Sequence, residues 1–282
     1  MISTSVTGGK PFLKWAGGKG KLLPQLHALL PLGFNNYFEP FVGGGAVFFS
    51  LVHSGTSVIS DINTDLMNVY QHIKDDINIV ITELKKIELE YKQLSQEARQ
   101  EYYYLRRAEY NATSSGLRKS ILFLFLNKTC FNGLYRQNSK GEFNVPFGRY
   151  ANPAICNEEN LYVVANKLQS TIIKNVSYQD AVKDAKAGDF IYFDPPYHPL
   201  NGTSSFTAYH ADGFTSEDQE ELRDIFAVLD KRGCYVKLSN SSSEFIKSLY
   251  KDFRQETIYA ARAINSRASK RGKIEELVVL NY

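Results

Sequence analysis

The residues best suited to chemistry are Asp194-Pro195-Pro196-Tyr197, which follow the apolar run Phe190 to Phe193. An amine on a heteroaromatic ring delocalises its lone pair into that ring, so it needs two hydrogen-bond acceptors before its nitrogen can attack an electrophilic methyl group. We expect the Asp194 carboxylate and the Pro195 carbonyl to be those acceptors. Pro196 would complete a rigid turn, and Tyr197 would stack on the ring. The simpler alternative is a Pro-Pro turn that only caps a strand.

We expect Asp194 to orient the amine and to stabilise positive charge on it, not to act as a general base. An aspartate has a reference pKa of about 3.9, so it accepts a proton poorly from an amine that is not yet cationic. None of the three cysteines follows a proline in the motif used by enzymes with a cysteine nucleophile that attack pyrimidine carbons. The five histidines show no metal-ligand spacing, so the sequence predicts no metal site.

Three glycines and one aspartate predict a nucleoside-type ligand. Gly43, Gly44 and Gly45 follow the apolar run Tyr37 to Val42, and Asp61 lies 18 residues beyond Gly43, near the place where nucleotide-binding folds bind a ribose with an acid. Phe48 stands where a dinucleotide fingerprint has its third glycine, and no phosphate anchor is evident. S-adenosylmethionine fits a site without phosphate recognition. The alternative is a glycine turn that only packs a helix on a sheet.

Alternating strands and helices would position these residues. Tyr37 to Val42, the glycine turn and Ala46 to Leu51 predict a strand, a turn and a helix. Val58 to Asp61 and Phe190 to Phe193 predict two further strands, and such alternation is typical of a parallel α/β sheet. The remaining predicted elements are a helix with a capping box of Ser216 and Gln219 that ends at Gly233, and strands over 235–238 and 277–280.

The alternation is interrupted from about residue 68 to residue 174, where the pattern is mostly helical and then aromatic and rich in loops. We therefore predict two parts. Residues 1–67 and 175–282 would form the α/β domain, and residues 68–174 would form an inserted domain.

Composition excludes several classes of protein. The chain has 282 residues, of which 43% are hydrophobic and 13% aromatic, so disorder and fibrous architectures are excluded. The longest apolar run, Ile121 to Leu126, is far shorter than the roughly 18 residues of a membrane span. Residues 1–10 do not resemble a secretory signal, and the cysteines lie too far apart for a disulfide scaffold. We expect a soluble, cytoplasmic protein without a membrane partner.

Two stretches are basic although the formal net charge is only +3. One extends from Leu117 to Tyr150 and the other from Arg262 to Lys273. A solvated surface would explain a charge run alone, but aromatic residues and glycines interleave with the first stretch, which favours contact with nucleic acid. The residues expected to neutralise phosphates are Arg118, Lys119, Arg271 and Lys273.

Five motifs together resemble the Dam family of DNA adenine-N6 methyltransferases, and the likeness extends from Pro11 to Tyr282. The motifs are Phe12-Leu13-Lys14-Trp15-Ala16-Gly17-Gly18-Lys19, Glu39-Pro40-Phe41-Val42-Gly43-Gly44-Gly45, Asn132-Gly133-Leu134-Tyr135-Arg136, Phe143-Asn144-Val145-Pro146-Phe147-Gly148-Arg149-Tyr150 and Asp194-Pro195-Pro196-Tyr197. Their order is similar to that of the alpha group of amino-methyltransferases.

The resemblance implies an α/β fold with a Rossmann-like, S-adenosylmethionine-dependent methyltransferase sheet, and a mostly helical target-recognition insert. It implies methylation of adenine N6 in double-stranded DNA at GATC. We also expect a monomer in solution that acts in the manner of restriction-modification enzymes. Because the amine is enclosed in a duplex, the base must flip out to reach Asp194, and residues 199–213 are placed to close over it.

The resemblance also assigns binding residues. Those implied for the cofactor are Trp15, Lys19, Phe41, Gly43, Gly45, Asp61, Tyr178 and Asp194. Those implied for DNA are Lys14, Phe131, Asn132, Leu134, Arg136, Pro146, Arg149 and Tyr150, to which the basic residues Arg271 and Lys273 are added. Family members often have an aromatic residue with a hydroxyl at the position of Phe131, so we expect stacking there without a hydroxyl hydrogen bond.

Three alternatives use related features. An N4-cytosine methyltransferase shares the amine chemistry but more often has Ser in place of Asp194. A glutamine side-chain methyltransferase usually has Asn there. A DNA-binding module with an inactive cofactor fold is disfavoured because the glycines, Asp61 and Asp194 are all present.

Overall fold

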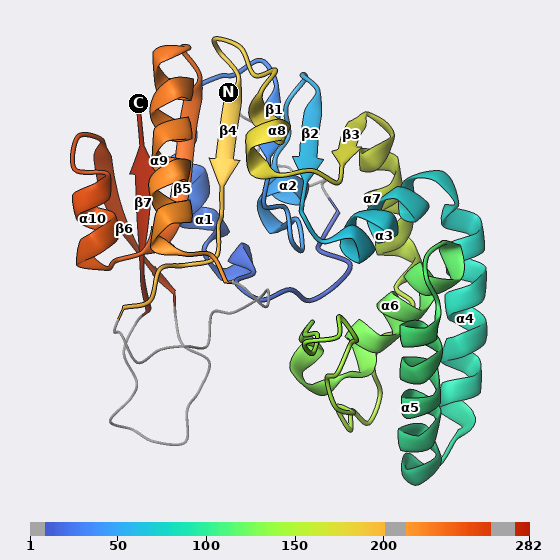
Figure 1. The fold of residues 1–282 in the computed structure, drawn as a ribbon. Helices are drawn as coiled ribbons and strands as arrows, with labels where there is room; N and C mark the ends of the chain where they lie inside the picture. The colour runs from blue at the N-terminus through green and yellow to red at the C-terminus, as the bar shows by residue number, and fades with distance from the viewer. Residues whose placement is uncertain (1–8, 201–212, 261–273) are drawn as a thin grey trace. The chain divides into compact units, whose positions relative to one another are not determined.

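The computed structural model describes residues 9–200, 213–260 and 274–282 (Figure 1). The described strands form one sheet in the order β3-β2-β1-β4-β5-β7-β6. β1 pairs in parallel with β2 and β4, and β4 with β5, whereas β7 is antiparallel to β5 and β6. The predicted α/β fold class is confirmed. The strands are β1 Tyr37–Glu39, β2 Ser57–Ser60, β3 Thr171–Lys174, β4 Phe190–Phe193, β5 Tyr235–Ser241, β6 Arg254–Ala260 and β7 Ile274–Leu280.

Helices occupy most of the remaining described chain, and none of them is long and apolar enough to cross a membrane. The α-helices are α1 Leu23–Ala28, α2 Ala46–Ser50, α3 Thr64–Asp75, α4 Ile77–Gln93, α5 Gln96–Ala112, α6 Leu117–Thr129, α7 Glu158–Gln169, α8 Tyr178–Val182, α9 Ser216–Lys231 and α10 Glu244–Leu249, and the 3₁₀ turns are Lys19–Lys21 and Phe131–Gly133.

Contacts divide the chain into two packing units, which are described separately below. The first unit comprises Met1–Gly18, Gly43–Val52 and Asp61–Asn175. The second comprises Lys19–Val42, His53–Ser60 and Val176–Tyr282. The glycine turn and α2 thus group with the helices of the predicted insert, and the predicted domain boundaries at residues 67 and 175 stay a prediction.

The core of the second unit lies between the sheet and α8, α9 and α10 (Figure 1). Successive strand residues point to opposite faces, so Ile191 and Phe193 enter this core while Phe190 and Tyr192 point to the other face. On α9, the buried Leu222, Phe226 and Leu229 follow the helical period. Parallel strands covered on both faces are apolar throughout, as β4 is.

The start of α9 corrects one prediction. The N-cap is Thr215, whose Oγ1 accepts a hydrogen bond from Asp218 N at 3.2 Å, while Asp218 Oδ2 accepts one from Thr215 N at 2.7 Å. The predicted capping box of Ser216 and Gln219 is therefore wrong by one residue. Gln219 is fully buried, and its amide bonds elsewhere.

In the first unit, α6 packs against α3, α4 and α5 (Figure 1). Its residues Ile121–Leu126 are all buried, because a helix that is apolar on every side needs partners on every side. Tyr91 and Tyr102 meet Phe125 edge-on, at centroid distances of 5.6 and 5.7 Å. These helices form a firm base for the loop that follows α6.

Candidate active site

Asp194 follows the last residue of β4 and forms an ion pair with Lys19. The Lys19 Nζ lies 2.9 Å from Asp194 Oδ1 and 4.6 Å from the centroid of the Tyr197 ring. Only 3% of the Lys19 side chain is exposed, against 18% of that of Asp194. Burial raises the pKa of Asp194 to about 6, although Lys19 opposes the rise. Three predicted site residues therefore lie together in the second unit.

Glu276 on β7 belongs to the same cluster, and the sequence analysis missed it. The Tyr197 hydroxyl donates to Glu276 Oε2 at 2.6 Å, and Lys19 Nζ lies 3.8 Å from the same oxygen. Burial, followed by the charges of Asp194 and Glu276, raises the pKa of Tyr197 well above its usual value. The sequence could have marked Glu276 as a buried carboxylate. Side chains alternate along a strand, so Glu276 lies on the same face as the buried Val278 and Leu280.

The chain after Asp194 is held by two buried amides. Gln219 on α9 donates to the Pro196 carbonyl at 2.9 Å and accepts from Asn240 on β5 at 2.9 Å. The Asn240 side chain in turn accepts from His198 N at 3.1 Å. The Pro-Pro turn is thus fixed from two elements, and the bond from Gln219 uses the Pro196 carbonyl, not that of Pro195.

The glycine turn of the first unit is built around Asp61. Gly43 has φ +47°, and a Cβ at this position would lie 2.5 Å from Trp15 Cδ1, so only glycine fits. Gly43 N donates to Asp61 Oδ2 at 3.1 Å, and Asn63 N donates to Asp61 Oδ1 at 3.0 Å. Gly45 has φ +70° and precedes α2. Asp61 therefore supports the turn, a structural role that the sequence did not indicate. Its predicted contact with a ribose stays a prediction.

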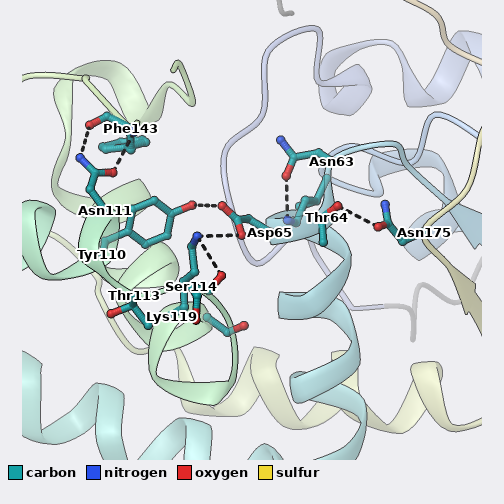
Figure 2. A network of polar contacts seen from close by, with 12 residues as sticks. Asn63, Thr64, Asp65, Tyr110, Asn111, Thr113, Ser114, Lys119, Phe143 and Asn175 are labelled. Atoms are coloured by element: carbon teal, nitrogen blue, oxygen red, sulfur yellow. Dashed lines mark hydrogen bonds and ion pairs between the residues drawn. The ribbon is translucent and has the colours of Figure 1, made fainter. Parts of the chain in front are cut away.

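A polar network anchors the segment after Asp61 to the helices of the first unit. Figure 2 shows Asp65 on α3 accepting from Tyr110 of α5 and facing Lys119 of α6, whose Nζ lies 3.3 Å away. On the other side, Thr64 donates to the Asn175 side chain at 2.8 Å. The Lys119 ion pair is a structural alternative to its predicted phosphate contact.

The aromatic residues predicted for the cofactor lie in stacks. In the second unit, Phe41 stacks on Tyr178 with a centroid distance of 5.3 Å, and the Tyr178 hydroxyl donates to Glu221. In the first unit, Trp15 stacks on Tyr135 at 5.3 Å, and its ring lies beside Gly43. Each stack offers an aromatic surface that would suit a flat, apolar ligand.

Most of the residues predicted to bind DNA lie on the 130–150 loop of the first unit. Its ends meet at an antiparallel bridge between Cys130 and Phe147. Residues Phe131 and Leu134 are 51% and 41% exposed, so both side chains are accessible for the predicted contact. The other exposed predicted residues on the loop are Asn132, Arg136, Pro146 and Arg149, and Tyr150 is half-buried.

Lys14 is fastened to the same loop. Its backbone N and O bond to the Asn127 side chain, both at 2.9 Å. Its side chain packs on Gly133, where a Cβ would lie 2.3 Å from Lys14 Cδ, and its Nζ lies 5.3 Å from the centroid of the Tyr150 ring. The structure thus brings Lys14 together with the loop residues, across more than a hundred residues of chain.

Arg136 is exposed, and its side chain is oriented from within the loop. Its Nε donates to Asn144 Oδ1 at 2.7 Å, and Asn144 N donates to the Arg136 carbonyl at 3.1 Å. Arg271 and Lys273 lie outside the described residues, as does most of the 199–213 segment.

A match to a family model identifies the family of enzymes in which this set of residues occurs. The model of the D12 class of N6 adenine-specific DNA methyltransferases matches residues 15–264. The chain belongs to this family. It is an adenine-specific DNA methyltransferase whose methyl donor is S-adenosylmethionine, so the alternatives of cytosine N4 and a glutamine side chain are excluded.

Relatives match almost the whole length of this D12-class enzyme. The type II methyltransferase M1.LlaDCHI of Lactococcus lactis subsp. cremoris is 43% identical, over 97% of this chain and 95% of that protein. The type II methyltransferase M.MjaIII of Methanocaldococcus jannaschii is 44% identical, over 97% and 99%. The DNA adenine methylase of Escherichia coli K12 is 37% identical, over 96% and 95%. The predicted resemblance to Dam enzymes is confirmed.

The described residues fit the methyl donor of the family. A Cβ at Gly43 would meet the Trp15 ring, so glycine lets this predicted cofactor residue lie directly against the turn. Within the first unit, the Asp61 carboxylate at this turn is a hydrogen-bond acceptor of the kind that a ribose hydroxyl needs.

Proposed function

We propose that this D12-class enzyme methylates adenine N6 at GATC in double-stranded DNA, and that the target base leaves the helix to react. The cluster of Lys19, Asp194 and Tyr197 carries the proposal that the base leaves the helix. The Asp194 carboxylate is partly buried, so it cannot reach an amine that is still stacked and paired inside a duplex. The GATC target is supported by the likeness of residues 132–136 and 143–150 to Dam motifs. Action as a monomer and a cytoplasmic location stay predictions from the sequence.

In the proposed mechanism, Asp194 and the Pro195 carbonyl accept the two hydrogens of the amine, and Tyr197 stacks on the base. Bound S-adenosylmethionine supplies the electrophilic methyl group. The Asp194 pKa of about 6 means that the acceptor form dominates above that pH, and Lys19 favours this form by its charge. Positive charge that develops on the amine nitrogen is stabilised by the fixed carboxylate.

We assign the cofactor-binding residues by their chemistry. Asp61 would accept hydrogen bonds from the ribose hydroxyls, since both oxygens of a carboxylate are acceptors and the side chain is held at the glycine turn. Gly43 and Gly45 would contribute through the turn that they form, since both have a positive φ. The aromatic residues Trp15, Phe41 and Tyr178 would contact the apolar parts of the ligand, with Tyr178 at its adenine.

We assign the DNA-binding residues to two roles. The base edges would be contacted by Lys14, Leu134, Arg136 and Pro146, and the exposed Phe131 would stack into the duplex. Phosphates would be contacted by residues that carry positive charge or polar groups at the edge of the loop. These are Asn132, Arg149 and Tyr150, with Arg271 and Lys273.

Mapping the methylated base tests the proposal directly. The enzyme is incubated with labelled S-adenosylmethionine and unmethylated duplexes that contain either GATC or a scrambled site. Nucleases that distinguish methylated from unmethylated GATC, together with nucleoside analysis, then locate the label. We expect N6-methyladenine at GATC alone. Equal labelling of the scrambled duplex would overturn the target sequence, but not the adenine chemistry.

Arg136→Ala is expected to relax specificity at one guanine. The planar guanidinium matches the O6 and N7 acceptors of guanine, so its loss should cost about 1 to 3 kcal/mol on the target and little on random DNA. The Nε bond to Asn144 orients the guanidinium group, and the Arg136 side chain is exposed. The measurement is the Kd for target and scrambled duplexes at several salt concentrations.

Lys273→Ala is the comparison for Arg136→Ala, because a phosphate contact carries no sequence information. It should weaken binding to both duplexes alike and lower the salt slope by about one. A uniform loss for Arg136→Ala would show that Arg136 also contacts phosphate.

A further inference from the structure

Glu276 is the second carboxylate of the Asp194 cluster, and the mechanism above gives it no role. It lies on β7, opposite Ser241 of β5 and Ile258 of β6. Its side chain is 11% exposed, and its Oε2 accepts the hydrogen bond of the Tyr197 hydroxyl at 2.6 Å. The neighbouring Glu275 is exposed, because alternate residues of a strand face opposite ways. Glu276 is thus turned toward the site by the register of the sheet.

Among the residues that the structure describes, the cluster holds one positive and two negative side chains. Lys19 Nζ lies 2.9 Å from Asp194 Oδ1 and 3.8 Å from Glu276 Oε2. Two carboxylates that share one ammonium in a largely buried site repel each other, which raises the free energy of the folded protein. An apolar residue at position 276 would avoid that cost. The second carboxylate therefore points to a requirement of the reaction.

The hydroxyl bond fixes the far end of the Tyr197 ring. A tyrosine side chain rotates about two single bonds, and a short bond at its hydroxyl removes much of that freedom. The ring is then held from both ends, by the Pro-Pro turn and by β7. Its face lies beside Lys19 and hence next to the Asp194 carboxylate.

Glu276 also offers Lys19 a second anionic partner. The target amine must bond to Asp194, whose Oδ1 faces the Lys19 ammonium. When the amine arrives, Lys19 can move toward Glu276 without leaving its charge unpaired. The added negative charge also favours the positive charge that develops on the amine nitrogen.

We propose that Glu276 is a positioning residue for methyl transfer: it orients the Tyr197 ring through the hydroxyl and accepts Lys19 when the target amine takes its place beside Asp194. The proposal rests on the stacking of the target base on Tyr197. It assigns Glu276 no direct contact with the base or the cofactor.

Glu276→Gln removes the charge but keeps an oxygen that accepts from Tyr197. We expect its single-turnover rate to fall about tenfold or more, as for the loss of a hydrogen bond to a charged group, with little change in KM for DNA or cofactor. Because the charge of Glu276 raises the pKa of Asp194, the acid limb of the rate profile should move to lower pH. Glu275→Gln is the matched control and should leave rate and limb unchanged.

A double-mutant cycle tests the route through Tyr197. Glu276→Leu and Tyr197→Phe each remove one end of the same hydrogen bond, so the double variant should be about as slow as the slower single variant. Thermal melting and DNA binding of each variant identify any that fail to fold. Additive losses, or Glu276 variants as fast as wild type, would overturn the proposal.

The wild-type enzyme separates this inference from the proposed function. If it methylates no GATC adenine, the proposed target is wrong, and the Glu276 variants are assayed on the adenine that is methylated. If wild type methylates GATC and the Glu276 variants match it, only the role of Glu276 fails.

Discussion

Asp194→Ala should lower the rate of methyl transfer by about a hundredfold or more, the loss typical of removing a preorganised polar stabiliser. The variant loses one of the two acceptors that we propose for the amine, and the negative charge that would stabilise the developing cation. Duplex binding should largely persist, because the residues proposed to bind DNA lie elsewhere in the sequence. The measurement is a single-turnover assay with saturating cofactor and DNA, alongside a DNA-binding titration.

Asp194→Asn is the matched variant, because it keeps the shape and one acceptor but removes the charge. Its rate of methyl transfer should lie between that of the wild type and that of Asp194→Ala. In the wild type, Lys19 Nζ also lies 3.8 Å from Glu276 Oε2, so a carboxylate partner for Lys19 stays in both variants. We therefore expect both to fold, and thermal melting checks this. Turnover of Asp194→Ala near the wild-type rate would contradict the proposed mechanism, in which Asp194 accepts a hydrogen bond from the amine.

Asp61→Ala should weaken the binding of S-adenosylmethionine by about 1.5 to 3 kcal/mol, the range for hydrogen bonds to a charged group. It removes the acceptor proposed for the ribose hydroxyls, and it leaves Gly43 N and Asn63 N without their bonds to the Asp61 carboxylate. Both effects lower the affinity, the second by loosening the turn. Calorimetry gives the affinity, and melting without cofactor gives the loss of stability.

Asp65→Asn separates the two effects of Asp61→Ala. Asp65 lies four residues further along and supports the same segment through Tyr110 and Lys119, with no proposed contact to the cofactor (Figure 2). This variant should melt earlier but bind the cofactor nearly as wild type does. If Asp61→Ala left the affinity unchanged, Asp61 would be a structural residue only.

Local patterns predicted the parts of the site that are continuous in sequence. The apolar run before Asp194 forms β4, and the glycine turn at Gly43 precedes α2. The hydrophobic period and the residues that favour turns are local properties of the sequence, so they can be recognised without knowledge of the fold. The helix α9 also begins where predicted, although its cap is Thr215.

Contacts between distant segments could not be predicted in the same way. The hydrogen bond from Tyr197 to Glu276 joins residues that are 79 positions apart, and the sequence around either residue does not indicate which residue it contacts. Gln219 was misassigned because a local capping pattern fits it as well, whereas tertiary packing turned its amide toward Pro196. The second role of Asp61 was missed because it depends on the conformation of the Gly43 turn.

The closed ends of the 130–150 loop have a consequence for how enzymes of this kind diverge. The bridge of Cys130 and Phe147, with the bond from Gly148 N to the Thr129 carbonyl, sets where the chain leaves and rejoins the helices. Closing a loop twice as long costs only about 0.6 kcal/mol more. An insertion at the exposed tip near Gly141 should therefore cost the scaffold little, so this is where we expect the loop to be able to change in length.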